Sequence, residues 1–254
     1  MQIATWNLNS LRVRLPQVLA WLKDNPVDVL AVQETKMPDA EFPADALREA
    51  GYECAFSGQR TYNGVAILSR QPARDPDTDL PGLEDPQRRV LAATVAGVRV
   101  VDLYVPNGES VDSDKYRYKL KWLEHLRDYL TDQLEAHPEL VVVGDFNIAP
   151  EPRDVHDPAE WEGKVLFSEP ERAALGALLE LGLIDTFRLF DQPENSFSWW
   201  DYRMNAFRRN RGLRIDYILA SETLANRCRS CAIDRAPRGW ERPSDHAPVV
   251  AEFE

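Results

Sequence analysis

Short apolar runs recur along the chain, some continuous and some alternating with polar residues, and they predict β-strands. The clearest run is 140–143, which is followed by Gly144, Asp145, Phe146 and Asn147. Because side chains alternate between the two faces of a strand, Asp145 and Asn147 point one way while Phe146 points into the core. Gly144 allows another backbone or a ligand to approach closely. Further strands are expected at 1–8, 27–32, 52–57, 64–69, 89–96, 99–105, 213–220, 228–234 and 247–253.

Apolar residues at helical spacing predict helices at 11–23, 40–50, 115–136 and 170–181. Pro16 is typical of a first helical turn, so the first helix is expected to begin near it. Gly51 and Gly182 mark helix ends. The segment 75–86, rich in Pro and Asp, is expected to be a loop, and 151–167 a polar loop with a short helix.

Strands and helices are mixed throughout the 254 residues, with no repeat or low-complexity linker. The hydrophobic content of 44% is enough for a sizeable core, so residues 1–254 are expected to form a single domain with helices packed outside two sheets. No run approaches the roughly 20 apolar residues that span a bilayer, and the first residues lack a signal-peptide pattern. The expected location is cytoplasmic, with no membrane partner.

The cysteines and the charge limit the possible functions. Cys228 and Cys231 have a spacing found in zinc and redox sites, but no second pair and no nearby histidine completes a ligand set. A net charge of −12 argues against non-specific nucleic-acid binding by the whole surface. Residues 202–214, however, hold five arginines and no acid. They form either a solvated face or a surface for phosphate groups.

Polar residues cluster at strand ends. Six follow apolar strands: Asn7, Glu34, Tyr104, Asn107, Asp145 and Asn147. Three precede strands: Asp216, Asp245 and His246. If the second group runs antiparallel to the first, all of them converge on one edge of the sheets, where the carboxylates repel one another unless a cation neutralises them. Carboxylate and amide oxygens suit Mg²⁺ or Mn²⁺ better than zinc.

Seven motifs, spread over almost the whole chain, resemble those of the exonuclease III family of class II AP endonucleases, within the endonuclease/exonuclease/phosphatase superfamily. They are Trp6-Asn7-Leu8-Asn9, Gln33-Glu34-Thr35-Lys36, Gly64-Val65-Ala66, Tyr104-Val105-Pro106-Asn107-Gly108, Gly144-Asp145-Phe146-Asn147, Arg214-Ile215-Asp216-Tyr217 and Ser244-Asp245-His246-Ala247-Pro248. The resemblance implies a four-layered α/β sandwich of the DNase I type. It also implies a Mg²⁺-dependent phosphodiesterase that cuts duplex DNA 5′ to abasic sites, with 3′→5′ exonuclease and 3′-phosphatase activities.

The resemblance also assigns roles. The implied metal ligands are Asn7, Glu34, Asp145, Asn147 and Asp245. The implied catalytic residues are Tyr104, Asp145, Asn147, Asp216, Asp245 and His246, with His246 aligned by Asp245 and donating to the phosphate in the transition state. Tyr104, Asp145 and a metal-bound hydroxide remain alternative general bases. The implied DNA-binding residues are Asn107, Phe197, Trp199, Arg203, Arg208, Arg209, Arg211 and Arg214.

Two alternatives stay open. A phosphatase or another nuclease of the same fold would share the Asn, Glu, Asp-x-Asn and Asp-His core. A non-catalytic nucleic-acid-binding regulator of this fold need not keep its metal ligands, whereas here Glu34, Asp145 and His246 are all present. The expected partner is double-stranded DNA with abasic sites or 3′ ends, and no exposed apolar stripe suggests a dimer, so a monomer is expected.

Overall fold

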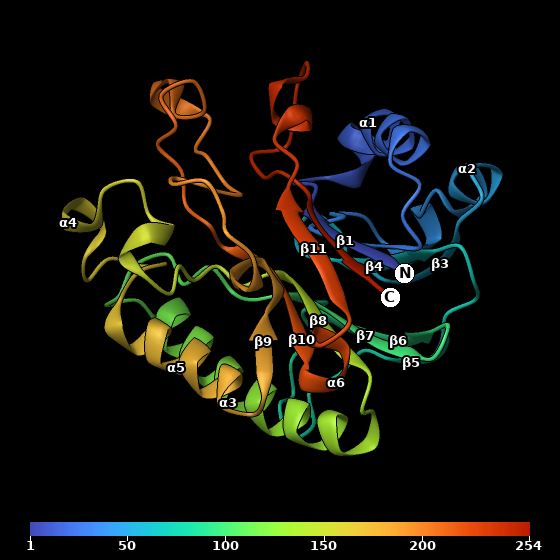
Figure 1. Cartoon of the computed structure of the whole chain (residues 1–254), viewed down its shortest axis with the longest axis horizontal. Coiled ribbons are helices and arrows are strands. Elements are labelled where there is room, and N and C mark those ends of the chain that lie inside the picture. The colour runs from blue at the N-terminus through green and yellow to red at the C-terminus, as the bar shows by residue number, and fades with distance from the viewer.

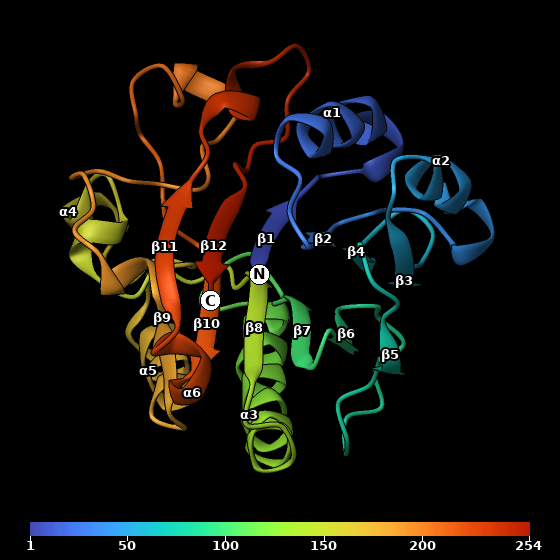
Figure 2. The ribbon, with the colours of Figure 1, turned by 45° about the vertical axis from the view of Figure 1, so that its right-hand side comes forward.

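The computed structural model describes residues 1–254 and contains two six-stranded sheets packed face to face. Helices cover the outer face of each sheet, which gives four layers in the order helix, sheet, sheet, helix (Figures 1 and 2). This architecture confirms the expected α/β sandwich with two mixed sheets. No helix is both long and apolar enough to cross a membrane.

The first sheet has the strand order β11-β12-β1-β2-β4-β3. Its strands are β1 (Gln2–Asn7), β2 (Val29–Gln33), β3 (Glu53–Ser57), β4 (Val65–Ser69), β11 (Cys228–Ile233) and β12 (Val249–Phe253). Strands β1 and β2 are parallel, and the other neighbours are antiparallel.

The second sheet has the strand order β5-β6-β7-β8-β10-β9. Its strands are β5 (Arg74–Asp77), β6 (Val90–Val95), β7 (Val98–Tyr104), β8 (Leu140–Asp145), β9 (Leu183–Asp185) and β10 (Asp216–Ser221). Strands β7 and β8 are parallel, and the other neighbours are antiparallel. The two strands of each central pair, β1 with β2 and β7 with β8, therefore run in the same direction. Strands β12 and β10, which lie next to these pairs, run in the opposite direction.

Alternating side chains build three apolar layers. On β1, Ile3 faces the space between the sheets, while Ala4 and Trp6 face α1 (Leu11–Asp24) and α2 (Ala44–Glu49). On β8, Val141 and Val143 face the same space, and the intervening residue packs under α3 (Asp114–Ala136) and α5 (Glu169–Leu179). The short helices α4 (Pro158–Trp161) and α6 (Glu222–Ala225) lie in connections.

Three expectations about elements are wrong. Helix α1 begins at Leu11 and continues through Pro16, because Leu11 and Val18 bury their side chains on either side of the exposed proline and outweigh the one backbone hydrogen bond it removes. The expected 40–50 helix is only the six-residue α2, preceded by Pro43. Strands β5 and β9 were not expected, since β5 is an exposed edge strand containing Pro76 and β9 has three residues.

Candidate active site

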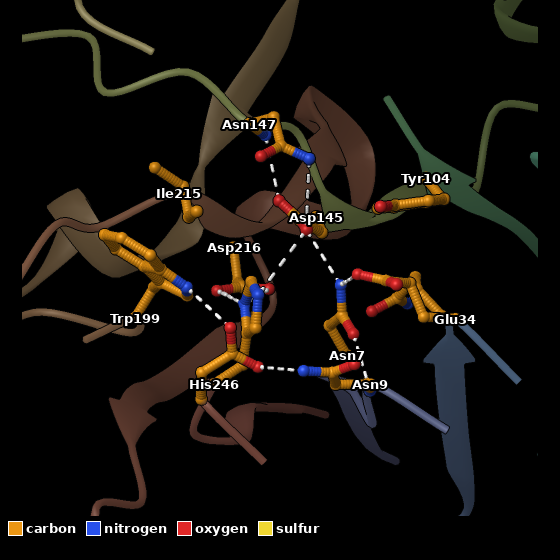
Figure 3. Close-up of polar contacts among 12 residues, drawn as sticks. Asn7, Asn9, Glu34, Tyr104, Asp145, Asn147, Trp199, Ile215, Asp216 and His246 are labelled. Atoms are coloured by element: carbon orange, nitrogen blue, oxygen red, sulfur yellow. Dashed lines mark hydrogen bonds and ion pairs between the residues drawn. The ribbon is translucent and has the colours of Figure 1, made fainter. Parts of the chain in front are cut away.

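The polar residues continue the inward-facing rows of the two sheets. On β1 the row ends at Asn7, on β7 at Tyr104 and on β8 at Asp145. Asp145 pairs in register with Tyr104 of β7 on one side and Asp216 of β10 on the other. The expected convergence is therefore confirmed, and the site lies at one end of the core between the sheets (Figure 3).

Strands β7 and β8 approach closely where Gly144 lies. This glycine has φ of +137°, and a Cβ there would come within 2.0 Å of the Leu103 carbonyl oxygen. The expectation that Gly144 admits another backbone is confirmed. The close approach places Asp145 next to Tyr104 at the end of both strands (Figure 3).

His246 is held by Asp216 in a buried ion pair. Its Nδ1 donates to Asp216 Oδ2 at 2.9 Å, and its Nε2 lies 3.7 Å from Asp145 Oδ2. Burial alone would lower the pKa of His246, but the carboxylates of Asp216 and Asp145 outweigh it and raise this pKa to about 10. The imidazole is therefore a cation at neutral pH, with Nε2 directed toward Asp145.

Ser198 completes this side of the site. Its Oγ donates to Asp216 Oδ2 at 2.6 Å and accepts from the backbone N–H groups of Ile215 and Asp216. The sequence did not indicate Ser198, because its partner lies 18 residues away and only the register of the connecting loop brings them together.

Asp145 is buried and surrounded by donors. Its Oδ2 accepts from the side-chain amides of Asn7 at 2.9 Å and Asn147 at 3.2 Å, and its Oδ1 accepts from the Asn147 backbone N–H at 2.9 Å. Burial raises the pKa of Asp145 to about 7, which the His246 cation opposes and the Asp216 charge reinforces. An isolated aspartate has a pKa near 3.9, so this carboxylate is a far stronger proton acceptor than usual.

The second side of the site carries Glu34. The amide of Asn7 donates to Glu34 Oε1 at 3.0 Å as well as to Asp145, and so bridges two carboxylates (Figure 3). Lys36 forms an ion pair with Glu34 Oε2 at 2.8 Å. The side chains of Lys36 and Glu34 are 26% and 16% exposed, so this side of the site is more open to solvent than the side of His246 and Asp216, which are 5% and 0% exposed. Lys36 lies in a motif recognised in the sequence, yet nothing there indicated its contact with Glu34.

Asp245 does not align His246, and that expectation is wrong. Its Oδ2 accepts from Trp199 Nε1 at 3.0 Å and its Oδ1 from Asn9 Nδ2 at 3.0 Å. Burial alone would raise the pKa of Asp245, but the nearby His246 cation and these hydrogen bonds outweigh it and lower this pKa. Adjacent residues of an extended chain point to opposite sides, so the aligning carboxylate comes from Asp216 of the second sheet instead.

Tyr104 and Asn107 lie on the far side of Asp145 from His246. Burial, followed by repulsion from Glu34 and Asp145, raises the pKa of Tyr104 well above its usual range. The protonated phenol is therefore favoured, and its O–H can donate a hydrogen bond. Asn107 donates from Nδ2 to Asn147 Oδ1 at 3.1 Å.

The aromatic element 197–200 is only partly at the surface. Phe197 and Trp200 are fully buried and pack with Ala206 and Ala247, so Phe197 cannot contact DNA as expected. Trp199 is half-buried and lines a cavity of about 590 Å³ with Trp161, Met204 and the carboxylate-paired Arg203 and Arg211. On the other side of the site, a cavity of about 880 Å³ borders Tyr104 and Asn107.

The five arginines of 202–214 are not alike. Arg214 is buried, ion-paired with Asp154 and Asp185, and therefore cannot bind DNA as expected. Arg203 and Arg211 are paired with Asp201 and Glu160. The inference that this segment has no compensating carboxylate is wrong, because the acids come from outside it. Arg208 and Arg209 are exposed and form no ion pair.

The donor set suits a hard divalent cation. Asp145, Asp216 and His246 bring ligand atoms within 4.8 Å of one another, and Asn7 links Asp145 to Glu34. The carboxylate donors offer oxygen atoms, and the cysteines are elsewhere: Cys228 and Cys231 lie on β11, and no histidine joins them. Of the expected ligands, Glu34, Asp145 and Asn7 are direct neighbours, and the Asn7 carbonyl would join the two carboxylates if its amide reverses. Asn147 donates its side-chain amide to Asp145, and Asp245 accepts from Trp199 and Asn9.

The two sheets, the outer helices and the acid–imidazolium cluster define the endonuclease/exonuclease/phosphatase fold, and residues 4–246 match that family. The chain belongs to the Endonuclease/Exonuclease/phosphatase family. It is 36% identical to exodeoxyribonuclease III of Haemophilus influenzae, with both chains covered completely. A Neisseria 3′ phosphatase bound to a product DNA hairpin is 49% identical, with a TM-score of 0.99 over 100% of this chain and 99% of that one. An AP endonuclease from Archaeoglobus fulgidus is 42% identical, with a TM-score of 0.96 over 100% and 99% of the chains.

Proposed function

We propose that this protein is a Mg²⁺-dependent DNA-repair phosphodiesterase that cuts 5′ to abasic sites and also removes nucleotides and blocking phosphates from 3′ ends. Mn²⁺ is the alternative metal. The observation that carries the proposal is the pairing of a buried carboxylate, Asp145, with a buried cation, His246, between cavities on either side. The relatives named as exodeoxyribonuclease III, 3′ phosphatase and AP endonuclease support the choice of DNA as substrate.

In this mechanism Asp145 accepts the proton of the attacking water. Its raised pKa, about 7, suits a base that works near neutral pH. Asn147 fixes Asp145 through both its backbone N–H and its side-chain amide, and so orients the acceptor oxygen. Asp145 is favoured over Tyr104 because burial and the nearby carboxylates oppose ionisation of the phenol.

Hydrogen-bond donors that are already in place stabilise the negative charge that develops on the phosphate in the transition state. His246 donates from Nε2, and its charge is maintained by Asp216, which Ser198 holds in place. Tyr104 donates its phenol from the opposite side. A divalent cation held by Glu34 and Asp145 would screen the phosphate and stabilise the leaving 3′ oxygen.

The cavity beside Trp199 supports incision at abasic sites. Its wall combines the apolar surfaces of Trp161, Trp199, Met204 and Ala206 with polar atoms from His156 and from the ion-paired side chains of Glu160, Asp201, Arg203 and Arg211. An extruded sugar without a base matches this mixed lining, and such a nucleotide costs little to extrude because it has no base to unstack. The chain would act as a single domain and as a monomer in the cytoplasm.

The test is incision of a labelled duplex with one abasic-site analogue, next to an undamaged duplex with a recessed 3′ end and a 3′-phosphorylated duplex. We expect cutting 5′ to the lesion with Mg²⁺ and none with EDTA. The ratios of the three rates rank the activities. A folded protein that cuts none of the three with Mg²⁺ or Mn²⁺ would favour a non-DNA phosphatase or a non-catalytic regulator.

A further inference from the structure

A buried ion pair lies beneath the loops that carry Asn107 and Asn147. Lys119 of α3 and Glu171 of α5 both have completely buried side chains. The Lys119 ammonium donates to the Asn147 carbonyl oxygen at 2.6 Å, to the Asn107 carbonyl oxygen at 3.1 Å and to Glu171. All three of its donor positions are used, and two of them are used on site loops.

These contacts fix residues that touch Asp145. Asn147 has φ of 50°, in the left-handed region, which asparagine adopts more readily than most other residues with a Cβ. Its backbone N–H and side-chain amide hold both oxygens of Asp145, and its Nδ2 also donates to the Val105 carbonyl oxygen. A shift of the Asn147 backbone would therefore move the Asp145 carboxylate.

The Asn107 loop is packed tightly onto the same lysine. Gly108 has φ of +95°, and a Cβ there would lie 3.3 Å from Lys119 Cδ and 3.4 Å from the Tyr116 ring. Glu171 is fixed in turn, because it accepts from the backbone N–H groups of Leu166 and Ser168 in the cap of α5. The ion pair thus joins two helices of the outer layer to two loops of the site.

Stability alone does not explain this arrangement. Desolvating two charges costs about as much as their attraction returns, so a buried pair is often no more stable than apolar side chains of the same volume. An apolar pair here would leave the carbonyl groups of Asn107 and Asn147 without their donor. What the ion pair provides, and an apolar pair would not, is an ammonium that binds both of these carbonyl oxygens.

We propose, on the basis of the proposed function, that Lys119 is a positioning residue for the DNA-cleaving reaction. Its ammonium fixes the Asn107 and Asn147 backbones, and through Asn147 it sets the direction of Asp145. With no exposed surface it cannot reach the substrate, so it acts on the chemical step and not on DNA binding. Glu171 holds the ammonium in place but does not contact either loop carbonyl.

The test compares two variants that both lack the ion pair. Glu171→Gln keeps Lys119 and its bonds to both carbonyls, while its single amide oxygen can accept from the backbone N–H of either Leu166 or Ser168. Lys119→Met in the Glu171→Gln background removes the ammonium without leaving a buried charge. We expect kcat to fall about 10²-fold in the double variant relative to Glu171→Gln, with KM for DNA within about threefold, since small misplacements of a catalytic group have effects of this size.

Amide hydrogen exchange at Asn147 gives a readout independent of cleavage. We expect faster exchange in the double variant and no change in Glu171→Gln alone. Equal kcat and equal exchange in the two variants would overturn the proposal. If the double variant does not fold, Lys119→Gln in the same background serves instead, because its shorter amide reaches at most one carbonyl; equal kcat would again contradict the role. If the unmodified protein cuts no DNA, the proposed function fails, while the exchange comparison still tests the positioning.

Discussion

The two sides of the site solve the same electrostatic problem in different ways. On one side, the charge of Asp145 and Asp216 is balanced by His246, which is buried and permanently placed. On the other, the charge of Glu34 is balanced by Lys36 on a solvent-reached surface. The buried side therefore keeps its positive charge on His246. On the open side, a bound metal ion could take over from Lys36 the neutralisation of Glu34. Asn7 joins the two sides, since its amide donates to both Glu34 and Asp145.

The largest effect is expected from Asp145, which belongs to both sides. Asp145→Asn removes the proton acceptor but keeps the shape and most of the hydrogen bonds, so cleavage of the abasic duplex should fall roughly 10² to 10⁴-fold. DNA affinity and thermal unfolding should change little, and both can be measured on the same preparation. An asparagine variant that kept more than about a tenth of the rate would contradict a general-base role.

The pH dependence should separate the buried side from the open side. In the proposed mechanism activity requires ionised Asp145 and protonated His246, whose pKa values in the metal-free protein are about 7 and about 10. The rate should therefore rise through the first pKa and fall through the second, changing about tenfold per pH unit outside this window. A divalent cation favours ionised Asp145, so higher Mg²⁺ concentration should move the acid limb to lower pH. It also offsets the Asp145 charge that helps raise the pKa of His246, so the alkaline limb should move in the same direction. If the position of the acid limb did not change with Mg²⁺ concentration, Asp145 would not be a ligand of the metal.

Asp216→Asn sharpens the same comparison, because it removes the largest cause that raises the pKa of His246. The alkaline limb should move to lower pH, and the imidazole resonances should titrate with it. The sign for stability follows from the raised pKa. Protonated His246 stabilises the fold fully below the ordinary histidine pKa of about 6.5, and this contribution is lost as pH rises through about 10. In the variant that alkaline dependence of the unfolding midpoint should be weaker and lie at lower pH, because Asp145 still raises the pKa of His246.

A smaller effect is expected from Lys36 on the open side. Lys36→Met leaves Glu34 without its cation, so Mg²⁺ should bind up to about fivefold more tightly, in keeping with less than about 1 kcal/mol for a partly exposed pair. Lys36→Arg keeps the charge and is the matched control. Calorimetric titration of the metal into both variants makes the comparison, and a weaker affinity in the methionine variant would show that Lys36 supports the metal site instead of competing for it.

The strand-end residues could be predicted because strand geometry places them. Once β8 and β10 are recognised as strands, alternation and antiparallel pairing bring Asp145 and Asp216 to one edge without further information. The same argument does not fix side-chain contacts in a loop, which is why Asp245, the sequence neighbour of His246, was expected to align it. In the same way, one proline does not show whether a helix begins at it or continues through it, as α1 does at Pro16. Three residues are too few to show the alternation that predicts a strand such as β9.

Partners that come from distant segments could not be predicted. Arg214 looked free because its acids, Asp154 and Asp185, lie 60 and 29 residues away along the chain. Phe197 looked like a surface aromatic because its apolar neighbours come from the loop that follows and from the residue after His246. Asn9, Ser198 and Lys119 show the same limit, since each is given its role by a partner at least 18 residues away.

The smallest effect concerns the two arginines that form no ion pair. Arg208→Glu with Arg209→Glu should weaken DNA binding and lower the slope of log affinity against log salt by about 0.9 for each phosphate that the variant no longer neutralises. Arg203→Glu is the control from the same segment, because Arg203 is paired with Asp201 and its charge is already compensated. Binding to an uncleaved duplex with EDTA, measured at several salt concentrations, isolates this effect from catalysis. If Arg203→Glu lowered the slope as much as the double variant, the ion pairs would not distinguish the arginines that meet DNA, and the phosphate path would have to follow the whole of 202–214.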